Sequence, residues 1–91
     1  MTIARHRLID MMVDRRIKWP DGAKYAAQDY DQKPGLFIVC FYIETPERGL
    51  GPYWVGKRIR YADFQLDELC VDWHRTIIDR ETYEIALNDR K

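Results

Sequence analysis

The stretch that decides the fold is an unbroken apolar run, Leu36-Phe37-Ile38-Val39-Cys40-Phe41-Tyr42-Ile43. Most of its residues are aromatic or β-branched, and the run is too short for a stable globular helix, so it predicts a β-strand. Alternate residues of a strand point to opposite faces of a sheet, and here both sets are apolar. We therefore expect a central strand that helices cover on at least one side.

A helix is predicted near each end of the chain. Residues 3–16 have the periodicity of an amphipathic helix, which Thr2 can cap and which the turn Trp19-Pro20-Asp21-Gly22 ends. Asp79 is a good N-cap for a last helix over residues 80–88.

Other segments complete a small sheet. Strands are predicted over residues 23–30, 53–60 and 73–78, and residues 61–72 fit a short helical turn or an ordered loop. The expected fold is a single α+β domain over residues 1–91. Its antiparallel sheet has three to four strands, and the N-terminal and C-terminal helices pack on one face.

The charge of the chain is balanced in total but uneven along its length. The 91 residues contain 15 Lys or Arg and 15 Asp or Glu, and 46% are hydrophobic. The net charge is +3 over residues 1–24, −2 over 25–46, +3 over 47–62 and −4 over 63–91. The balance excludes a highly basic nucleic-acid or membrane coat and a strongly acidic mimic. The uneven segments form faces that steer a charged partner, cancel within the fold, or are simply solvated.

Composition also bears on compartment and cofactors. No apolar run approaches the roughly 20 residues that cross a bilayer, and the N-terminus does not resemble a secretory signal. Cys40 and Cys70 are too few for a disulfide scaffold. A Cys70–His74 pair supplies two ligands where zinc needs three or four. We expect a cytoplasmic, reduced protein with no membrane, metal or cofactor.

Catalytic patterns are missing as well. Carboxylates occur as scattered singles, and Asp29 with Asp31 at the mouth of a turn fits backbone capping better than cation binding. No phosphate-binding glycine loop or nucleophile elbow occurs, and a chain of this size has little room for a substrate cavity. The sequence therefore predicts a protein that is not an enzyme.

Aromatic and basic residues supply the candidates for binding. Tyr, Trp and Arg dominate interface energetics, so the leading hypothesis is a protein-binding module. Its predicted contacts are Arg48, Tyr53, Trp54, Lys57, Arg58 and Arg60, together with Arg15, Arg16 and Lys18. The alternative is a nucleic-acid-binding regulator that uses residues 53–61. Trp54 either contacts a partner or completes the core, and the sequence leaves open whether an exposed strand pairs two copies into a homodimer.

Two segments resemble small accessory proteins of tailed bacteriophages and prophages. The first is Trp19-Pro20-Asp21-Gly22-Ala23 followed by Ala26-Ala27-Gln28-Asp29-Tyr30-Asp31, a turn that leads into a strand with an acidic end. The second runs from Asp72-Trp73 to Ile77-Ile78-Asp79-Arg80-Glu81-Thr82-Tyr83, a strand-to-helix ending. The resemblance implies a phage protein that binds a host macromolecule and alters its activity, either by inhibiting a defence complex such as a CRISPR effector or by redirecting host transcription or replication. It transfers no functional residues.

Overall fold

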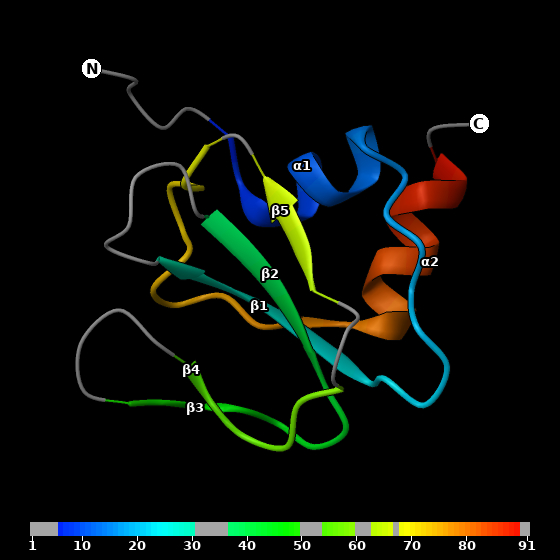
Figure 1. The fold of residues 1–91 in the computed structure, drawn as a ribbon. Helices are drawn as coiled ribbons and strands as arrows, with labels where there is room; N and C mark the ends of the chain where they lie inside the picture. The colour runs from blue at the N-terminus through cyan, green and yellow to red at the C-terminus, as the bar shows by residue number, and fades with distance from the viewer. Residues whose placement is uncertain (1–5, 31–36, 50–53, 60–62, 67, 90–91) are drawn as a thin grey trace.

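Two helices and six strands make up the described part of the chain, residues 6–30, 37–49, 54–59, 63–66 and 68–89 of a computed structural model (Figure 1). The helices are α1 (Leu8–Asp14) and α2 (Arg80–Asp89). A four-stranded sheet has the order β5-β2-β1-β6, formed by β1 (Tyr25–Tyr30), β2 (Phe37–Tyr42), β5 (Phe64–Leu66) and β6 (Ile78–Asp79). A separate two-stranded sheet joins β3 (Glu47–Arg48) to β4 (Trp54–Val55). The predicted α+β class is confirmed, and the described strand pairs are antiparallel.

Strand β2 is the central strand that its apolar sequence predicts. It pairs with β1 along its full length, from Tyr25 opposite Tyr42 to Tyr30 opposite Phe37. Its other edge pairs with β5, where Phe37 lies opposite Leu66. Both edges of β2 are therefore hydrogen-bonded, and both faces are available for burial.

Different elements cover the two faces of the sheet. Val39 and Phe41 point to the face where α1 and α2 pack, in a core with Leu8, Met12 and Tyr83. The two helices thus lie on one face, as expected. The opposite face carries Ala27, Cys40 and Tyr42, which pack against Trp54 of the small β3–β4 sheet. The apolar pattern on both faces of β2 follows from this double cover.

Helix α1 is shorter than predicted. The sequence pattern indicated a helix over residues 3–16, but Arg7 has an extended backbone with ψ of 155°, so the helix begins at Leu8. The carboxylate of Asp72 accepts a hydrogen bond of 2.9 Å from the Leu8 amide and caps this end from a distant part of the chain. The predicted cap, Thr2, lies outside the described residues.

The second half of the chain differs most from the predicted strands. The segment over 53–60 was expected to be one partner strand of β2, but only Trp54–Val55 is a strand there, and it pairs with β3. Further along, Arg58 forms an isolated bridge with Tyr42. The ambiguous segment 61–72 contains strand β5. The strand predicted over 73–78 is wrong, because residues 71–75 form turns and β6 begins only at Ile78.

The C-terminal helix agrees closely with its prediction. The carboxylate of Asp79 accepts a hydrogen bond of 3.0 Å from the Thr82 amide, so Asp79 caps α2 as expected. Tyr83 is buried, and Ala86 and Leu87 pack against the same core. Neither helix of the described chain combines the length and apolarity needed to cross a membrane.

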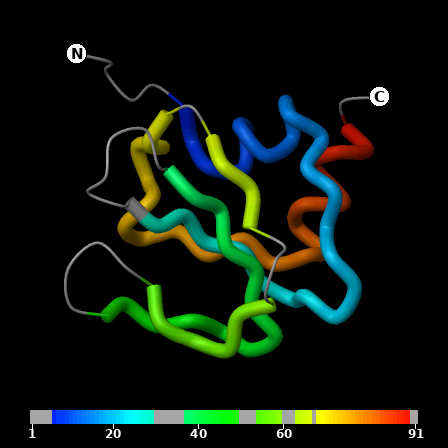
Figure 2. The backbone as a smooth tube through the Cα atoms, in the orientation of Figure 1, coloured from blue at the N-terminus to red at the C-terminus, as the bar shows by residue number. Residues whose placement is uncertain are grey.

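A loop connects α1 to β1 and runs along α2 (Figure 2). It is called the basic loop below and comprises residues 15–24. The Trp-Pro-Asp-Gly segment makes the predicted turn, in which the Ala23 amide donates to the carbonyl of Pro20 across 3.2 Å. Gly22 has a φ of 83°, a conformation that favours glycine. The turn directs the chain into β1.

Candidate functional site

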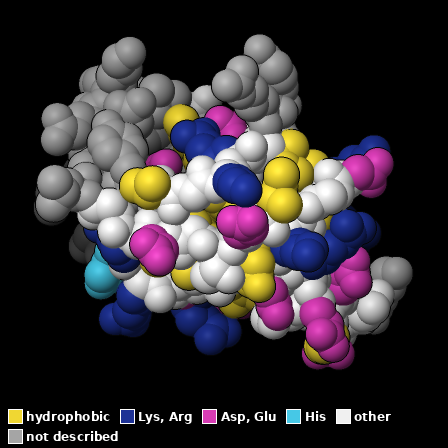
Figure 3. All heavy atoms as spheres, turned by 90° about the horizontal axis from the view of Figure 1, so that it is seen from below, with side chains coloured by type: hydrophobic (Ala, Val, Ile, Leu, Met, Phe, Trp, Pro, Cys, Tyr) yellow, Lys and Arg dark blue, Asp and Glu magenta, His cyan; other side chains and the backbone are white. Residues whose placement is uncertain are grey.

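The β3–β4 hairpin and the segment after it present three of the predicted basic contacts. Arg48, Lys57 and Arg58 are all exposed, while Tyr53 and Arg60 lie outside the described residues. The Arg58 guanidinium lies 2.8 Å from a carboxylate oxygen of Asp63, and the Lys57 ammonium lies 3.4 Å from Glu44. On the face seen from below, basic and acidic side chains are interspersed with apolar ones (Figure 3). Among the described residues of this surface, cations and carboxylates are intermixed.

Trp54 is in the core. The sequence left open whether it contacts a partner or completes the core, and its exposed fraction is 6%. Its amide donates a hydrogen bond of 2.8 Å to Asp29, and its indole N–H donates one of 3.1 Å to the carbonyl of Trp73. The indole covers the sheet face that the helices leave open. Trp54 is therefore a structural residue in the free protein, not a surface contact.

Arg48 lies against two indole rings. Its guanidinium carbon is 5.3 Å from the ring centroid of Trp54 and 5.1 Å from that of Trp73. Both distances suit cation–π attraction. The predicted contact residue Arg48 thus takes part in holding the hairpin against the body of the protein.

A buried polar group lies beneath the hairpin. Asp29 is 5% exposed, and one of its carboxylate oxygens lies 3.8 Å from the Cys40 sulfur. Burial raises the pKa of the Asp29 carboxyl, while the hydrogen bond from the Trp54 amide and the charge of Arg58 act in the opposite direction. The Tyr42 hydroxyl is buried next to them and has no hydrogen-bond partner among the described residues.

This buried group is poorly suited to nucleophilic chemistry. Burial raises the pKa of the Cys40 thiol to about 12, and Asp29 adds to the effect. Burial likewise raises the pKa of the Tyr42 phenol. Thiolate and phenolate are the reactive forms, and both are suppressed at neutral pH. In this group the Asp29 carboxylate therefore acts as a hydrogen-bond acceptor, and the Cys40 thiol has little reactivity.

The second cysteine is in a similar position. Cys70 is buried, and its amide donates a hydrogen bond of 2.8 Å to the side chain of Gln28. Burial raises the pKa of its thiol to about 12, with the nearby charge of Asp72 contributing. The ring nitrogen Nδ1 of His6 lies 2.9 Å from a carboxylate oxygen of Glu68. Within the described ranges, no three His, Cys, Asp or Glu side chains are placed to hold a metal ion.

The basic loop provides the other predicted contacts. Arg15, Arg16 and Lys18 are exposed, as is Lys24, which falls within a predicted strand and is not among the predicted contacts. The residue type is itself a signal of an exposed position, because lysine is almost never fully buried unless it is paired. In the described part of the chain, four cations have no ion-pair partner: Arg16, Lys18, Lys24 and Arg75. Three of the four lie on the basic loop.

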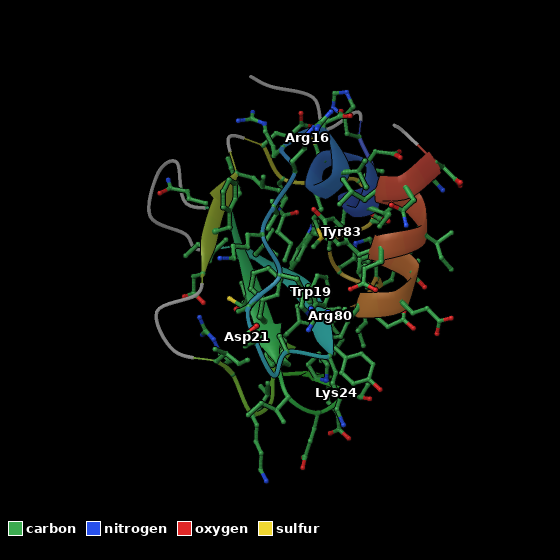
Figure 4. The ribbon with its side chains drawn as sticks, turned by 90° about the vertical axis from the view of Figure 1, so that its right-hand side faces the viewer. Arg16, Trp19, Asp21, Lys24, Arg80 and Tyr83 are labelled. Atoms are coloured by element: carbon green, nitrogen blue, oxygen red, sulfur yellow. The ribbon has the colours of Figure 1, made fainter. Side chains whose placement is uncertain are left out.

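Aromatic residues hold this loop in place. Trp19 is buried, with its ring centroid 5.4 Å from that of Tyr83 and 5.1 Å from that of Phe41. Its indole N–H donates to the carbonyl of Ala23 across 2.6 Å, inside the loop. Figure 4 shows Trp19 and Tyr83 together in the interior, Arg16 beside α1 and Lys24 at the other end of the loop. The loop that carries the unpaired cations is thus held in place by buried contacts.

Arg16 has an unusual backbone. It has a φ of 48°, and no other described residue except Gly22 has a positive φ. The Ile17 amide donates to the Met12 carbonyl and the Arg16 amide to that of Val13, which is the Schellman ending of a helix. The position after the C-cap in this motif is usually glycine, because a side chain there costs roughly 1–2 kcal/mol. An arginine is strained at this position.

The chain was compared with known protein families, curated proteins and solved structures, and none of them matches it. The candidate site therefore depends on its own geometry.

Proposed function

We propose that this protein is a non-enzymatic protein-binding module that acts by covering a surface of its partner. One observation carries the proposal: the exposed side chains of Arg16, Lys18 and Lys24 have no ion-pair partner in the described chain, and they lie on one loop. Lys57 and Arg58, which follow the β3–β4 hairpin, are already paired with acids of the chain. A partner gains more binding free energy from unpaired cations, because no ion pair within the protein has to be broken first.

The anchoring of the loop supports the same proposal. Binding loses affinity when flexible side chains and loops must be ordered at the interface. The basic loop is ordered by the ring contacts of Trp19 and by a hydrogen bond of 2.6 Å from Tyr83 to the carbonyl of Ile17. A partner therefore meets a backbone that already has one conformation.

The resemblance to phage accessory proteins suggests the kind of partner. It favours a host protein or a defence complex, such as a CRISPR effector, that loses activity when part of its surface is covered. Within residues 54–59, the described part of the segment 53–61, nucleic-acid binding gains no support, because Trp54 is buried and Lys57 and Arg58 are paired. Bases stack on exposed aromatic side chains in single-strand binders.

Affinity capture with matched variants tests this function. The tagged protein, the variant Arg16→Glu/Lys18→Glu and the control Lys57→Glu/Arg75→Glu are exposed to nuclease-treated bacterial lysate. Both variants change the net charge equally. We expect a protein that the parent and the control retain and that the loop variant loses. If the parent retains no protein from this lysate, in which nucleic acid has been degraded, the protein-binding function is wrong.

A further inference from the structure

The conformation of Arg16 calls for an explanation beyond folding. Glycine adopts a positive φ without steric cost, so it is the usual residue after the C-cap in this helix ending. This chain places an exposed arginine there, with φ of 48° and no ion-pair partner among the described residues. Strained residues persist where the side chain has a use, and they cluster at binding sites.

A favourable interaction with the helix dipole explains only part of this choice. A cation near a helix C-terminus is stabilised by the partial negative charge of the last carbonyls. Arg15, at the C-cap of α1, already places a cation at this end without a positive φ, since its φ is −84°. A second arginine at the strained position adds little to that interaction. Its guanidinium is instead directed to the surface, at the start of the basic loop.

An acid within the same loop identifies the class of partner. Asp21 is exposed and interrupts the series Arg16, Lys18 and Lys24. A nucleic-acid backbone is uniformly negative and would meet repulsion at Asp21. A protein segment can place glutamates opposite the cations and an uncharged or basic residue opposite Asp21. Alternating charge therefore selects a protein over a nucleic acid.

We propose that Arg16, Lys18 and Lys24 form a binding site for an extended acidic segment of a protein partner, with Arg16 as the principal contact. The inference deepens the proposed function and rests on it. Arg16 and Lys24 lie at opposite ends of the loop, so the bound segment runs along the loop rather than inserting into a pocket (Figure 4). The guanidinium offers a bidentate contact to a carboxylate, which lysine does not.

Fluorescence anisotropy with two probes tests the site directly. One probe is a short Glu-rich peptide and the other a single-stranded DNA oligonucleotide of similar charge, each measured at about 20 mM and about 200 mM salt. We expect the peptide to bind the parent and Lys57→Glu/Arg75→Glu equally. The variant Arg16→Glu/Lys18→Glu should bind at least about tenfold more weakly. Arg16→Lys should bind severalfold more weakly than the parent, since it keeps the charge and the strain but loses the guanidinium.

The variant Arg16→Gly separates this role from a structural one. It should raise the melting temperature by a few degrees while weakening peptide binding severalfold. The site is overturned if the peptide does not bind the parent at low salt, if Arg16→Glu/Lys18→Glu binds as tightly, or if the oligonucleotide binds more tightly than the peptide. If the lysate protein is still captured by Arg16→Glu/Lys18→Glu, the protein-binding function stands and this site is wrong. If the peptide binds as expected and no lysate protein is captured, the proposed function fails instead.

Discussion

The phenol of Tyr83 on α2 donates a hydrogen bond of 2.6 Å to the carbonyl oxygen of Ile17, 66 residues earlier in the chain. The same hydroxyl lies 3.3 Å from the carbonyl oxygen of Met12, at the end of α1. A single buried side chain thus connects the last helix to the first helix and to the basic loop. A tyrosine phenol, with an ordinary pKa of about 10, is protonated at neutral pH, and burial raises the pKa of Tyr83 further, so its hydroxyl can donate this hydrogen bond.

Removing this hydroxyl should destabilise the protein. The variant Tyr83→Phe keeps the ring and leaves the buried carbonyl of Ile17 without its donor, so we expect a loss of about 1–2 kcal/mol in the free energy of unfolding. Chemical denaturation measures it. Tyr25→Phe is the control, since the Tyr25 hydroxyl bonds to none of the described residues, and it should change stability by less than about 0.5 kcal/mol. Equal stability of the two variants would show that the Tyr83 bond contributes nothing.

The buried position of Trp54 predicts a large effect on folding. Trp54→Ala removes the indole that packs on Cys40 and Tyr42, and we expect a loss of about 3–5 kcal/mol in the free energy of unfolding. The neighbouring Val55 is 60% exposed, so Val55→Ala should stay within about 0.5 kcal/mol of the parent. Thermal and denaturant unfolding compare the two variants. A Trp54→Ala protein as stable as Val55→Ala would mean that the indole does not hold the hairpin in place.

Local signals predicted the elements whose causes are local. The apolar run over residues 36–43 predicted the central strand, because both of its faces are apolar and must be buried. Asp79 predicted the start of α2, because its carboxylate accepts a hydrogen bond from the amide of Thr82, only three residues further along the chain. In both cases the residues that determine the element lie within it or beside it.

Elements with distant causes were not predictable in this way. Helix α1 begins where Asp72 reaches the Leu8 amide from 64 residues away, and no local pattern contains that contact. Strand β5 is three residues long and exists through its pairing with β2. The same holds for the site: which cations are paired depends on acids from other segments, such as Glu44, 13 residues away from Lys57. The sequence could nominate Arg16 and Lys18 but could not separate them from the paired cations.

Both cysteines should resist thiol reagents in the folded protein. Burial raises the pKa of each thiol to about 12, so the thiolate that reacts is scarce at neutral pH and also inaccessible. We expect modification by a disulfide reagent to be at least about 100-fold slower in the native protein than in denaturant. Absorbance at pH about 8 follows the reaction. Rapid modification of one thiol would place that cysteine near the surface; Cys40→Ser and Cys70→Ser identify which.

The carboxyl of Asp29 should make stability depend on pH in a definite direction. Because burial raises its pKa in the folded state, the folded protein holds this proton more tightly than the unfolded chain does. The contribution of Asp29 is therefore most favourable below the ordinary aspartate pKa of about 3.9. It is lost as the pH rises through the higher folded value, where a charged carboxylate must stay buried.

Asp29→Asn isolates this effect. The amide oxygen can still accept the hydrogen bond from the Trp54 amide, which is 2.8 Å from the carboxylate in the parent, but the side chain no longer ionises. We expect the free energy of unfolding of the parent, relative to that of Asp29→Asn, to fall between pH about 4 and pH about 8. Denaturant unfolding of both proteins at each pH measures the difference. The prediction is wrong if the free energy of unfolding of the parent instead increases relative to that of Asp29→Asn as the pH rises. In that case the charge of Arg58 outweighs burial and holds Asp29 ionised.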